Sequence, residues 1–151
     1  MFEAKDPNYE LKVSESLAKQ GAVTAIGGKL ISVEPGRVIL ELPYSEKITQ
    51  QHGFVHAGIL TTMLDSAAGY AAFSLMPARA EVLTIEFKTN LMAPAKGRYF
   101  RFEGRVVKPG RTITFCEADA VAVSDDGESK KVATLTATMM VVQGRDDVKP
   151  G

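Results

Sequence analysis

The sequence predicts an α+β fold in which one antiparallel sheet curls around a single buried helix. The longest uninterrupted apolar stretch, residues 58–75, is rich in Ala, Leu and Met and contains one charged residue, Asp65. That composition favours a helix over a strand. Two β-like runs precede this stretch and four follow it. A helix that is apolar on nearly every side must be covered on several sides, and the six strands provide that cover.

The first half of the chain is expected to form a short helix and a hairpin. Residues 6–8, Asp-Pro-Asn, are typical of a helix entry, and a shared face runs from residue 9 to residue 20, just before Gly21. Residues 29–33 and 37–42 alternate in polarity on either side of a Glu-Pro-Gly turn signal, which predicts a hairpin. Residues 44–55 are expected to form a loop.

The second half is expected to form four consecutive strands, at about 82–92, 98–108, 111–124 and 131–142. Turn-forming segments separate them, and each predicts a hairpin; they are residues 94–97, 108–111 and 124–127. Small side chains share one face of the third strand and would let a helix lie close to the sheet; they are Cys116, Ala118, Ala120 and Ala122.

Length and composition predict one domain. A chain of 151 residues can bury a substantial core, and 45% hydrophobic with 24% charged residues is typical of a globular protein. Residues 29–143 are expected to form this domain, preceded by an N-terminal segment, 1–28, that contains the short helix, and followed by a flexible tail, 144–151. The single cysteine excludes an internal disulfide framework and a Cys-rich zinc site.

The charge balance and the hydropathy pattern exclude several classes of partner. The 18 basic and 18 acidic residues give a net charge of zero, so there is no general attraction to nucleic acid or to an anionic membrane. No stretch approaches the roughly 20 apolar residues of a membrane span. The first residues carry acids where a signal peptide needs an apolar core. We therefore expect a cytoplasmic protein.

Asp65 is the residue that most needs an explanation. An ionised carboxylate inside an apolar helix is costly unless it is paired or hydrogen-bonded. One interpretation is structural, with the carboxylate bonded to a neighbouring backbone group or hydroxyl. The other is functional, with Asp65 as a general base or a nucleophile in a cleft.

The start of the same helix is a candidate site for a developing negative charge. Ala57 and Gly58 leave backbone N–H groups unobstructed, which suits the oxyanion of a polarised thioester carbonyl. Gly58 and Asp65 lie on one helix face, about 10 Å apart along the axis. A base and an oxyanion donor must each lie about 3 Å from the reacting group, so one helix can hardly supply both. Two antiparallel copies can, which predicts an obligate homodimer at least.

The zero net charge conceals a segregation of charges. Six basic residues lie between residues 96 and 111 against one acid, Glu103, whereas residues 117–128 carry five acids and no base. The usual explanation is a solvated sheet face. The alternative is a phosphate-bearing ligand, because Lys and Arg near a turn bind phosphate well. Basic residues without stacked aromatic residues do not fit RNA or DNA.

These features together resemble the PaaI-like acyl-CoA thioesterases, the phenylacetate-degradation type of the hotdog-fold thioesterase superfamily. The string H-G-x-x-H-A-G-x-x-x-x-x-x-D at residues 52–65 is similar to the family pattern of an Asn followed by G-x-x-H-G-G and, after six intervening residues, Asp. The segment Met-Ala-Pro-Ala at residues 92–95 resembles the family's Met-Ser-Pro-Ala. The resemblance extends from about residue 29 to residue 142. It implies a hotdog fold and hydrolysis of an acyl-CoA or arylacetyl-CoA without a metal or cofactor.

The resemblance also assigns roles to individual residues. It implies that Asp65 is the catalytic carboxylate, either a general base for water or a nucleophile. Thr84 falls where relatives place a Ser or Thr that positions the attacking water. Gln50 stands at the position of the family's Asn and would hold the nucleophile or the carbonyl. Gln is longer than Asn by one methylene, which could shift the site.

At the helix start, the resemblance implies that the Ala57 N–H polarises the thioester carbonyl, aided by Gly58. His56 would orient that turn. Ala57 replaces the first glycine of the family's Gly-Gly pair, and a backbone donor tolerates this change if φ is negative. The resemblance thus implies an oxyanion site at the helix start, with two departures from the family pattern, at Ala57 and at Gln50.

The substrate and the assembly follow from the same resemblance. The CoA leaving group carries phosphates, for which Arg105, Lys108 and Arg111 are candidate partners. Candidate residues for the acyl tunnel are Met63, Tyr70, Phe73 and Leu83. Lookalikes commonly pair dimers into tetramers, so we expect a homodimer or a dimer of dimers. The alternatives are a non-catalytic acyl-CoA-binding protein and a hotdog hydratase, although the Asp, Asn-Pro and His string of the hydratases is absent.

Overall fold

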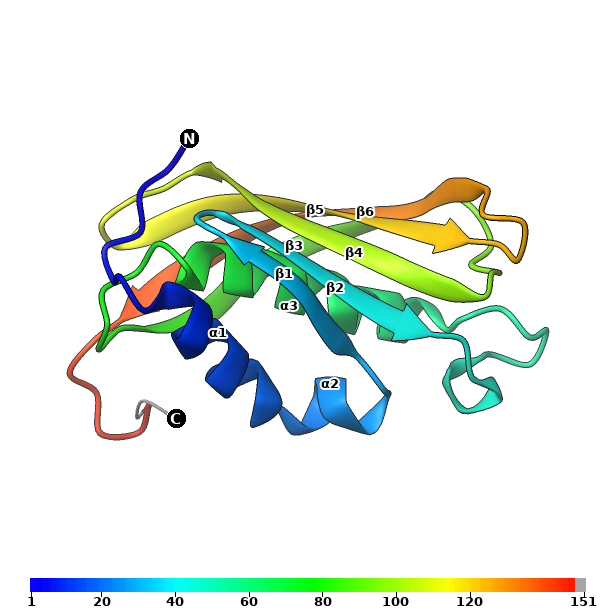
Figure 1. The fold of residues 1–151 in the computed structure, drawn as a ribbon, viewed down its shortest axis with the longest axis horizontal. Coiled ribbons are helices and arrows are strands. Elements are labelled where there is room, and N and C mark those ends of the chain that lie inside the picture. The colour runs from blue at the N-terminus through cyan, green and yellow to red at the C-terminus, as the bar shows by residue number, and fades with distance from the viewer. Residues whose placement is uncertain (149–151) are drawn as a thin grey trace.

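The computed structural model describes residues 1–148, in which a six-stranded antiparallel sheet arches over one long helix (Figure 1). The strands are β1 (Lys29–Glu34), β2 (Arg37–Pro43), β3 (Glu81–Leu91), β4 (Tyr99–Lys108), β5 (Ile113–Val123) and β6 (Ser129–Val142). The helices are α1 (Tyr9–Ala18), α2 (Gly21–Ala25), the 3-10 turn η1 (Glu46–Ile48) and the central helix α3 (Ala57–Phe73). The predicted α+β hotdog architecture is confirmed.

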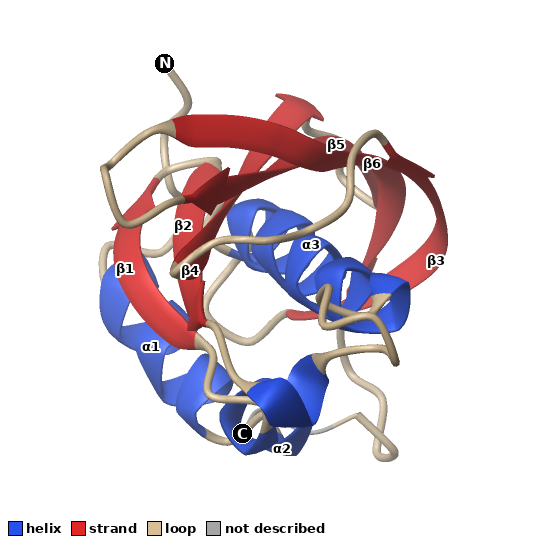
Figure 2. Ribbon diagram, turned by 90° about the vertical axis from the view of Figure 1, so that its right-hand side faces the viewer, coloured by secondary structure: helices blue, strands red, loops and turns tan. Residues whose placement is uncertain are grey.

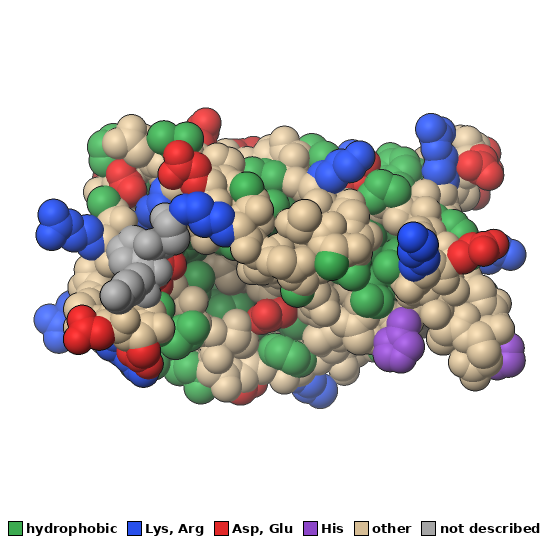
Figure 3. All heavy atoms as spheres, turned by 90° about the horizontal axis from the view of Figure 1, so that it is seen from below, with side chains coloured by type: hydrophobic (Ala, Val, Ile, Leu, Met, Phe, Trp, Pro, Cys, Tyr) green, Lys and Arg blue, Asp and Glu red, His purple; other side chains and the backbone are tan. Residues whose placement is uncertain are grey.

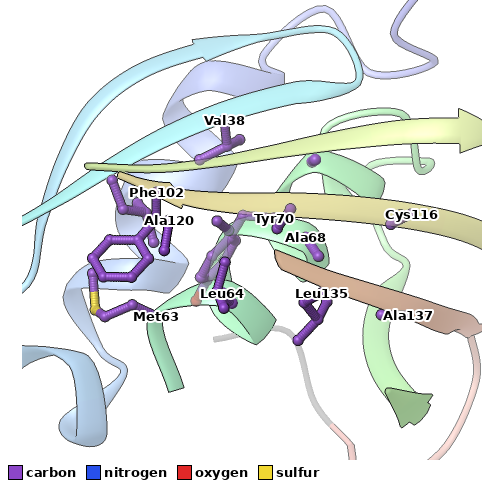
Figure 4. Packing of buried hydrophobic residues seen from close by; sticks show 14 of the residues in the cluster. Val38, Met63, Leu64, Ala68, Tyr70, Phe102, Cys116, Ala120, Leu135 and Ala137 are labelled. Atoms are coloured by element: carbon purple, nitrogen blue, oxygen red, sulfur yellow. The ribbon is translucent and has the colours of Figure 1, made fainter. Parts of the chain in front are cut away.

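Helix α3 lies in the concavity of the sheet, and Figure 2 shows the strands curving around it. Its side chains are buried almost continuously from Leu60 to Phe73. Figure 4 shows Met63 and Leu64 of α3 beside Phe102 of β4 and Leu135 of β6. The sheet therefore covers this helix, as the composition predicts, and helix α1 adds cover that the sequence analysis did not predict.

The sheet approaches α3 very closely at Gly104 of β4. A Cβ atom at this position would lie 2.1 Å from the carbonyl oxygen of Ala67 and 2.5 Å from the backbone nitrogen of Ala68. The predicted small-residue face of β5 is confirmed, because Cys116, Ala118, Ala120 and Ala122 are all buried. Small side chains on two adjacent strands therefore let the helix backbone rest against the sheet.

We expect the substitution Gly104→Ala to destabilise the fold by about 3 kcal/mol or more, because the new methyl group meets helix backbone that cannot move aside. The midpoint of urea unfolding measures the effect. Gly69→Ala is the matched control in α3. There a Cβ would meet only Met139 Cε, at 3.9 Å, and the change should stabilise the helix by up to about 1 kcal/mol. An unchanged midpoint for Gly104→Ala would contradict the close packing.

The hairpin predicted at residues 94–97 is wrong. Strand β3 pairs with β6 at one edge of the sheet, whereas β4 pairs with β2 and β5. Residues 92–98 therefore cross from the edge strand to the middle of the sheet. The Val55 N–H donates to the Ala95 carbonyl at 2.9 Å and holds this crossing segment beside the start of α3. Pro and Gly are common in turns and in crossing loops alike, so composition alone could not distinguish them.

The other predicted hairpins are confirmed, and the remaining differences are small. The turns at residues 34–36, 108–111 and 124–127 each join two paired strands. Gly21 does not simply end the first helix but begins the short helix α2, and the expected loop at residues 44–55 contains η1. Of the expected tail, residues 149–151 lie outside the described residues.

Helix α1 is anchored across the C-terminal end of α3 by Lys12. Its ammonium group donates to the carbonyls of Met76 and Pro77, at 2.9 and 3.2 Å, and lies 4.4 Å from the centre of the Phe73 ring. A cation at this point complements the negative end of the helix dipole. The anchor places the far end of α1 beside the middle of α3.

Candidate active site

Asp65 lies at the middle of α3 with its carboxylate directed at the edge strand β3. The Thr84 hydroxyl donates to Asp65 Oδ1 at 2.8 Å, and it also lies 3.4 Å from the sulfur of Met139. Among residues 1–148 no ion pair links Asp65 to a basic side chain. A half-buried carboxylate with one hydroxyl partner and no cation retains lone pairs that can accept a proton.

The environment of Asp65 makes it a stronger base than an exposed aspartate. Burial raises the pKa of Asp65, and the hydrogen bond from Thr84 lowers that pKa in part. Burial has the larger effect, so the net shift is upward. A carboxylate with a raised pKa is typical of a group that takes up a proton during a reaction.

The carboxylate borders a cavity of about 670 Å³ that is hollowed between α3, β3 and the N-terminal helices. Figure 3 shows this lower face of the molecule, with hydrophobic side chains around the hollow. One side of α3 contributes Gly58, Thr62, Asp65 and Gly69 to its wall. Gly58 and Asp65 thus share a helix face, as their spacing predicts.

A polar cluster that sequence reasoning missed closes one end of this cavity. Gln20, between α1 and α2, donates to the Tyr70 hydroxyl at 3.2 Å and accepts from the Ser66 hydroxyl at 3.0 Å. Ser16 lies 3.3 Å from the same tyrosine oxygen. Of the tunnel candidates, Tyr70 and Leu83 line the cavity, whereas Met63 and Phe73 are buried in the core. No local pattern reveals the cluster, because it joins residues about fifty positions apart.

At the start of α3, His56 caps the helix with its side chain. The backbone of His56 is extended, with φ −60° and ψ 137°, and its Nδ1 accepts the Gly58 N–H at 2.9 Å. Because Nδ1 accepts, the neutral ring carries its proton on Nε2. The Gly58 N–H is therefore already occupied. Within residues 1–148 the Ala57 N–H has no hydrogen-bond acceptor, so it is the available donor at this helix end.

Gln50 lies on the other side of the helix start from Asp65. It borders a separate cavity of about 430 Å³ together with Ala57, the last residue of β3, Leu91, and residues 92–95 of the crossing segment. Its side-chain oxygen accepts the His52 N–H, and its backbone bonds to Phe54 and Gly53. The structure thus brings Asp65 and Thr84 together around one cavity, and Gln50 and Ala57 around another.

The three basic residues considered for phosphate binding lie toward the C-terminal end of α3. The Arg105 guanidinium pairs with Glu117 at 2.8 Å and with Asp119 at 3.0 Å on the neighbouring strand. The turn that carries Lys108 and Arg111 packs near the residues that follow α3. Part of the charge segregation seen in the sequence thus becomes ion pairs between strands, from Arg105 to Glu117 and Asp119.

Two features are absent from the part of the chain that the structure describes. No group of three or more His, Cys, Asp or Glu side chains is arranged to hold a metal ion. No described helix is long and apolar enough to cross a membrane.

Comparison with known proteins gives one consistent relationship. A family model described as the thioesterase superfamily matches residues 52–128. A crystal structure of a thioesterase family protein from Silicibacter pomeroyi superposes with a TM-score of 0.88 at 52% identity, covering 90% of this chain and 99% of that one. The PaaI protein of the E. coli phenylacetic acid degradation operon superposes with a TM-score of 0.76 at 17% identity, covering 90% and 97%, and so shares the fold.

Curated relatives carry related descriptions. A predicted esterase of Halobacterium salinarum is 32% identical over 134 residues, 84% of this chain and 87% of that protein. Another, from Saccharolobus solfataricus, is 35% identical over 91 residues, 60% of this chain and 64% of that protein, so this match spans slightly less than two thirds of the relative. Human acyl-coenzyme A thioesterase 13 is 28% identical over 111 residues, 72% of this chain and 79% of the human protein.

Proposed function

This chain belongs to the thioesterase superfamily, and we propose that it hydrolyses an acyl-CoA to a free acid and CoA. The observation that carries the proposal is the Asp65 carboxylate, held by Thr84 at the wall of a large cavity without a cation partner among the described residues. Thioesters have a good leaving group, so a positioned carboxylate and an N–H donor suffice for hydrolysis. The name of the human relative supports acyl-CoA as the substrate class.

In the proposed reaction Asp65 acts as a general base for water or as the nucleophile. As a base, it takes a proton from the water whose oxygen forms the new bond to the thioester carbon. The C–S bond then breaks and CoA leaves as a thiolate, which takes up a proton. The Ala57 N–H stabilises the negative charge on the carbonyl oxygen, and His56 holds the turn through Gly58. Gln50 would hold the carbonyl or the nucleophile from the Ala57 side.

We assign each active site to two subunits. Ala57 and Asp65 are eight residues apart on one helix, about 12 Å along the axis, and Ala57 borders a different cavity from Asp65. A second chain that runs antiparallel would set its Ala57 beside the Asp65 of the first. The two-fold symmetry then creates two equivalent sites.

The edge strand β3 supports this homodimer. It is the last strand of the sheet, and its second edge has no strand partner within the described chain. It is eleven residues long, and Ile85, Phe87 and Leu91 are exposed on it. Long apolar edges promote pairing with another chain. Antiparallel pairing of two β3 strands would continue the sheet and place the two α3 helices side by side.

A second exposed apolar surface on the outer face of the sheet supports pairing of dimers into a tetramer. It spans four adjacent strands and comprises Leu83, Val107, Ile113, Phe115 and Met140. Ile113 and Leu83 both pair with Met140 across the strands, so the patch is continuous. Contiguous apolar patches of this kind commonly mark protein interfaces.

A thiol-release assay with a panel of acyl-CoA substrates tests the proposed function. Straight-chain and arylacetyl thioesters of increasing size are compared at fixed enzyme concentration. We expect release of free CoA with at least one compact or aromatic acyl group, at a rate proportional to enzyme. Tight binding of acyl-CoA without release from any member of the panel would favour the non-catalytic binding protein instead.

Thr84→Val removes the hydrogen bond to Asp65 at nearly constant volume, and we expect it to shift the acid limb of the activity profile. That bond lowers the pKa of Asp65, so its loss raises the pKa further. A base is active when deprotonated, so kcat/KM falls as pH falls through this pKa, and the variant should lose activity at a higher pH than wild type. A full pH profile measures the shift. Thr84→Ser, which keeps the hydroxyl, should restore the wild-type limb, whereas an unmoved limb in Thr84→Val would contradict the coupling.

A further inference from the structure

The cavity beside Asp65 is apolar along its strand side and polar at one end. Val82, Leu83 and Phe87 of β3 line the strand side. The polar end, toward the C-terminus of α3, is lined by Ser16, Gln20, Ser66 and Tyr70. None of the described residues that line this cavity is Lys or Arg, so the cavity suits an uncharged acyl group better than a phosphate.

The polar end sets a short reach for a chain that starts at Asp65. Asp65 and Tyr70 are five residues apart on α3, about 7.5 Å along the helix axis. In the proposed reaction the thioester carbon lies beside Asp65, and the acyl group extends from there into the cavity. This distance accommodates a short chain or a single ring, whereas a longer chain would meet the polar end.

Gln20 is fixed at this end by its own backbone and by its neighbours. It lies at the bend between α1 and α2, where its N–H donates to the Leu17 carbonyl at 3.0 Å and its carbonyl accepts the Thr24 N–H at 3.2 Å. Leu17 and Val23 are both buried in the core. The two side-chain bonds to α3, at 3.0 and 3.2 Å, direct the amide across the end of the cavity. A chain end that displaced this amide would break both bonds, and buried polar groups without partners are costly.

Gln20 also separates the cavity from solvent. It is half-buried, whereas Ser66 and Tyr70 are buried. Ala22, which lines the cavity beside it, has a small side chain. Truncation of Gln20 would therefore open the cavity to the surface beside α2, while Tyr70 would still close the side toward the core.

We infer that Gln20 determines the length of the acyl group, because its side chain ends the acyl pocket and restricts the substrates to CoA thioesters of short-chain or single-ring acids. This inference rests on the proposed function, because it takes the thioester carbon to lie beside Asp65. Each methylene added within the pocket buries more apolar surface against β3. Methylenes beyond that length push against the Gln20 amide, so long chains are excluded.

Calorimetric binding of S-alkyl-CoA thioethers to the purified protein tests the inference. These compounds keep CoA and the chain but lack the carbonyl, so hydrolysis cannot consume them. We expect wild-type affinity to rise from S-butyl-CoA to S-hexyl-CoA and to fall from S-octyl-CoA to S-dodecyl-CoA. In Gln20→Ala the Kd for S-dodecyl-CoA should fall by about tenfold or more relative to wild type, and the Kd for S-butyl-CoA should stay unchanged.

Three further variants separate pocket length from loss of structure. Gln20→Leu removes both side-chain hydrogen bonds but keeps the bulk, so it should retain the preference for short chains. Gln20→Asn is shorter by one methylene and should fall between wild type and Gln20→Ala, and it serves as the test if Gln20→Ala does not fold. Gln143→Ala makes the same truncation at an exposed position outside this cavity, and it should bind every thioether as wild type does.

An unchanged preference in Gln20→Ala or Gln20→Asn, with melting temperature and S-butyl-CoA affinity retained, would overturn the inference. Wild-type affinity that keeps rising through S-dodecyl-CoA, or equal gains in Gln20→Leu and Gln20→Ala, would overturn it as well. Hydrolysis is read separately, from kcat/KM with butanoyl-CoA and dodecanoyl-CoA. Chain-length-selective binding that depends on Gln20 without any hydrolysis would refute the proposed function and leave this role of Gln20 standing.

Discussion

Asp65→Asn is expected to lower kcat by about 10²–10⁴-fold while the fold and acyl-CoA affinity are retained. Asparagine has nearly the same shape, and its side-chain oxygen can still accept the Thr84 hydroxyl, which lies 2.8 Å from Asp65 Oδ1. It cannot take a proton from water or attack a carbonyl at neutral pH. Steady-state thiol release gives kcat, and calorimetry with CoA gives the affinity. The matched control is Asp146→Asn, at an exposed position outside both cavities, which should keep wild-type kinetics.

Thermal unfolding of Asp65→Asn distinguishes lost chemistry from lost structure. Burial raises the pKa of Asp65 in the folded state above its value in the unfolded chain. Asp65 is therefore harder to ionise in the folded state than in the unfolded chain. The stability of the folded state that comes from protonated Asp65 is present at low pH and is lost as pH rises through the folded-state pKa. Asparagine carries no charge, so at pH 8 the variant should melt at the same temperature as wild type or higher. A lower melting temperature together with lost activity would assign Asp65 a structural role instead.

The central helix could be predicted from local patterns, and so could the shared face of Gly58 and Asp65 on it. One charged residue stands in a long apolar helix, and Gly53, His56 and Gly58 precede it at fixed spacings. Such a pattern can be read from the sequence because residues on one helix keep the relative positions that their spacing gives them. The strand pattern was equally readable, because alternation and turn residues act over a few positions. The close packing of α3 against Gly104 also depends on a local property of the sequence, because glycine has no side chain.

The features that sequence reasoning missed depend on contacts between distant segments or on the rotamer of one side chain. The crossing at residues 92–98 follows from the pairing of β3 with β6, which no turn composition encodes. The Gln20, Ser66 and Tyr70 cluster exists because Lys12 anchors α1 over the end of α3. The Gly58 N–H donates to His56 Nδ1, and this bond could be recognised only once the rotamer of His56 was known. In each case the pattern was consistent with several three-dimensional arrangements, and packing selected one of them.

Ala57→Pro removes the one proposed oxyanion donor without disturbing the helix, and we expect it to lower kcat by about 10²–10³-fold. Proline is well tolerated at the first position of a helix, where its missing N–H breaks no helical bond. The preceding residue must be extended, and His56 already is, with φ −60° and ψ 137°. Ala57→Gly, which keeps the N–H and matches the family pattern, is the control and should retain activity.

Mixing two inactive variants then tests whether each site is built from two chains. In a heterodimer of Asp65→Asn and Ala57→Pro chains, one shared site would carry both defects and the other would pair a normal Asp65 with a normal Ala57. Equal mixing after subunit exchange makes about half of the dimers heterodimers, so activity should recover to about a quarter of wild type. Sites confined to one chain would recover nothing, because every chain carries one defect. Absence of recovery, with exchange verified by native mass spectrometry of a size-tagged chain, would therefore refute the shared site and leave the role of Asp65 itself untouched.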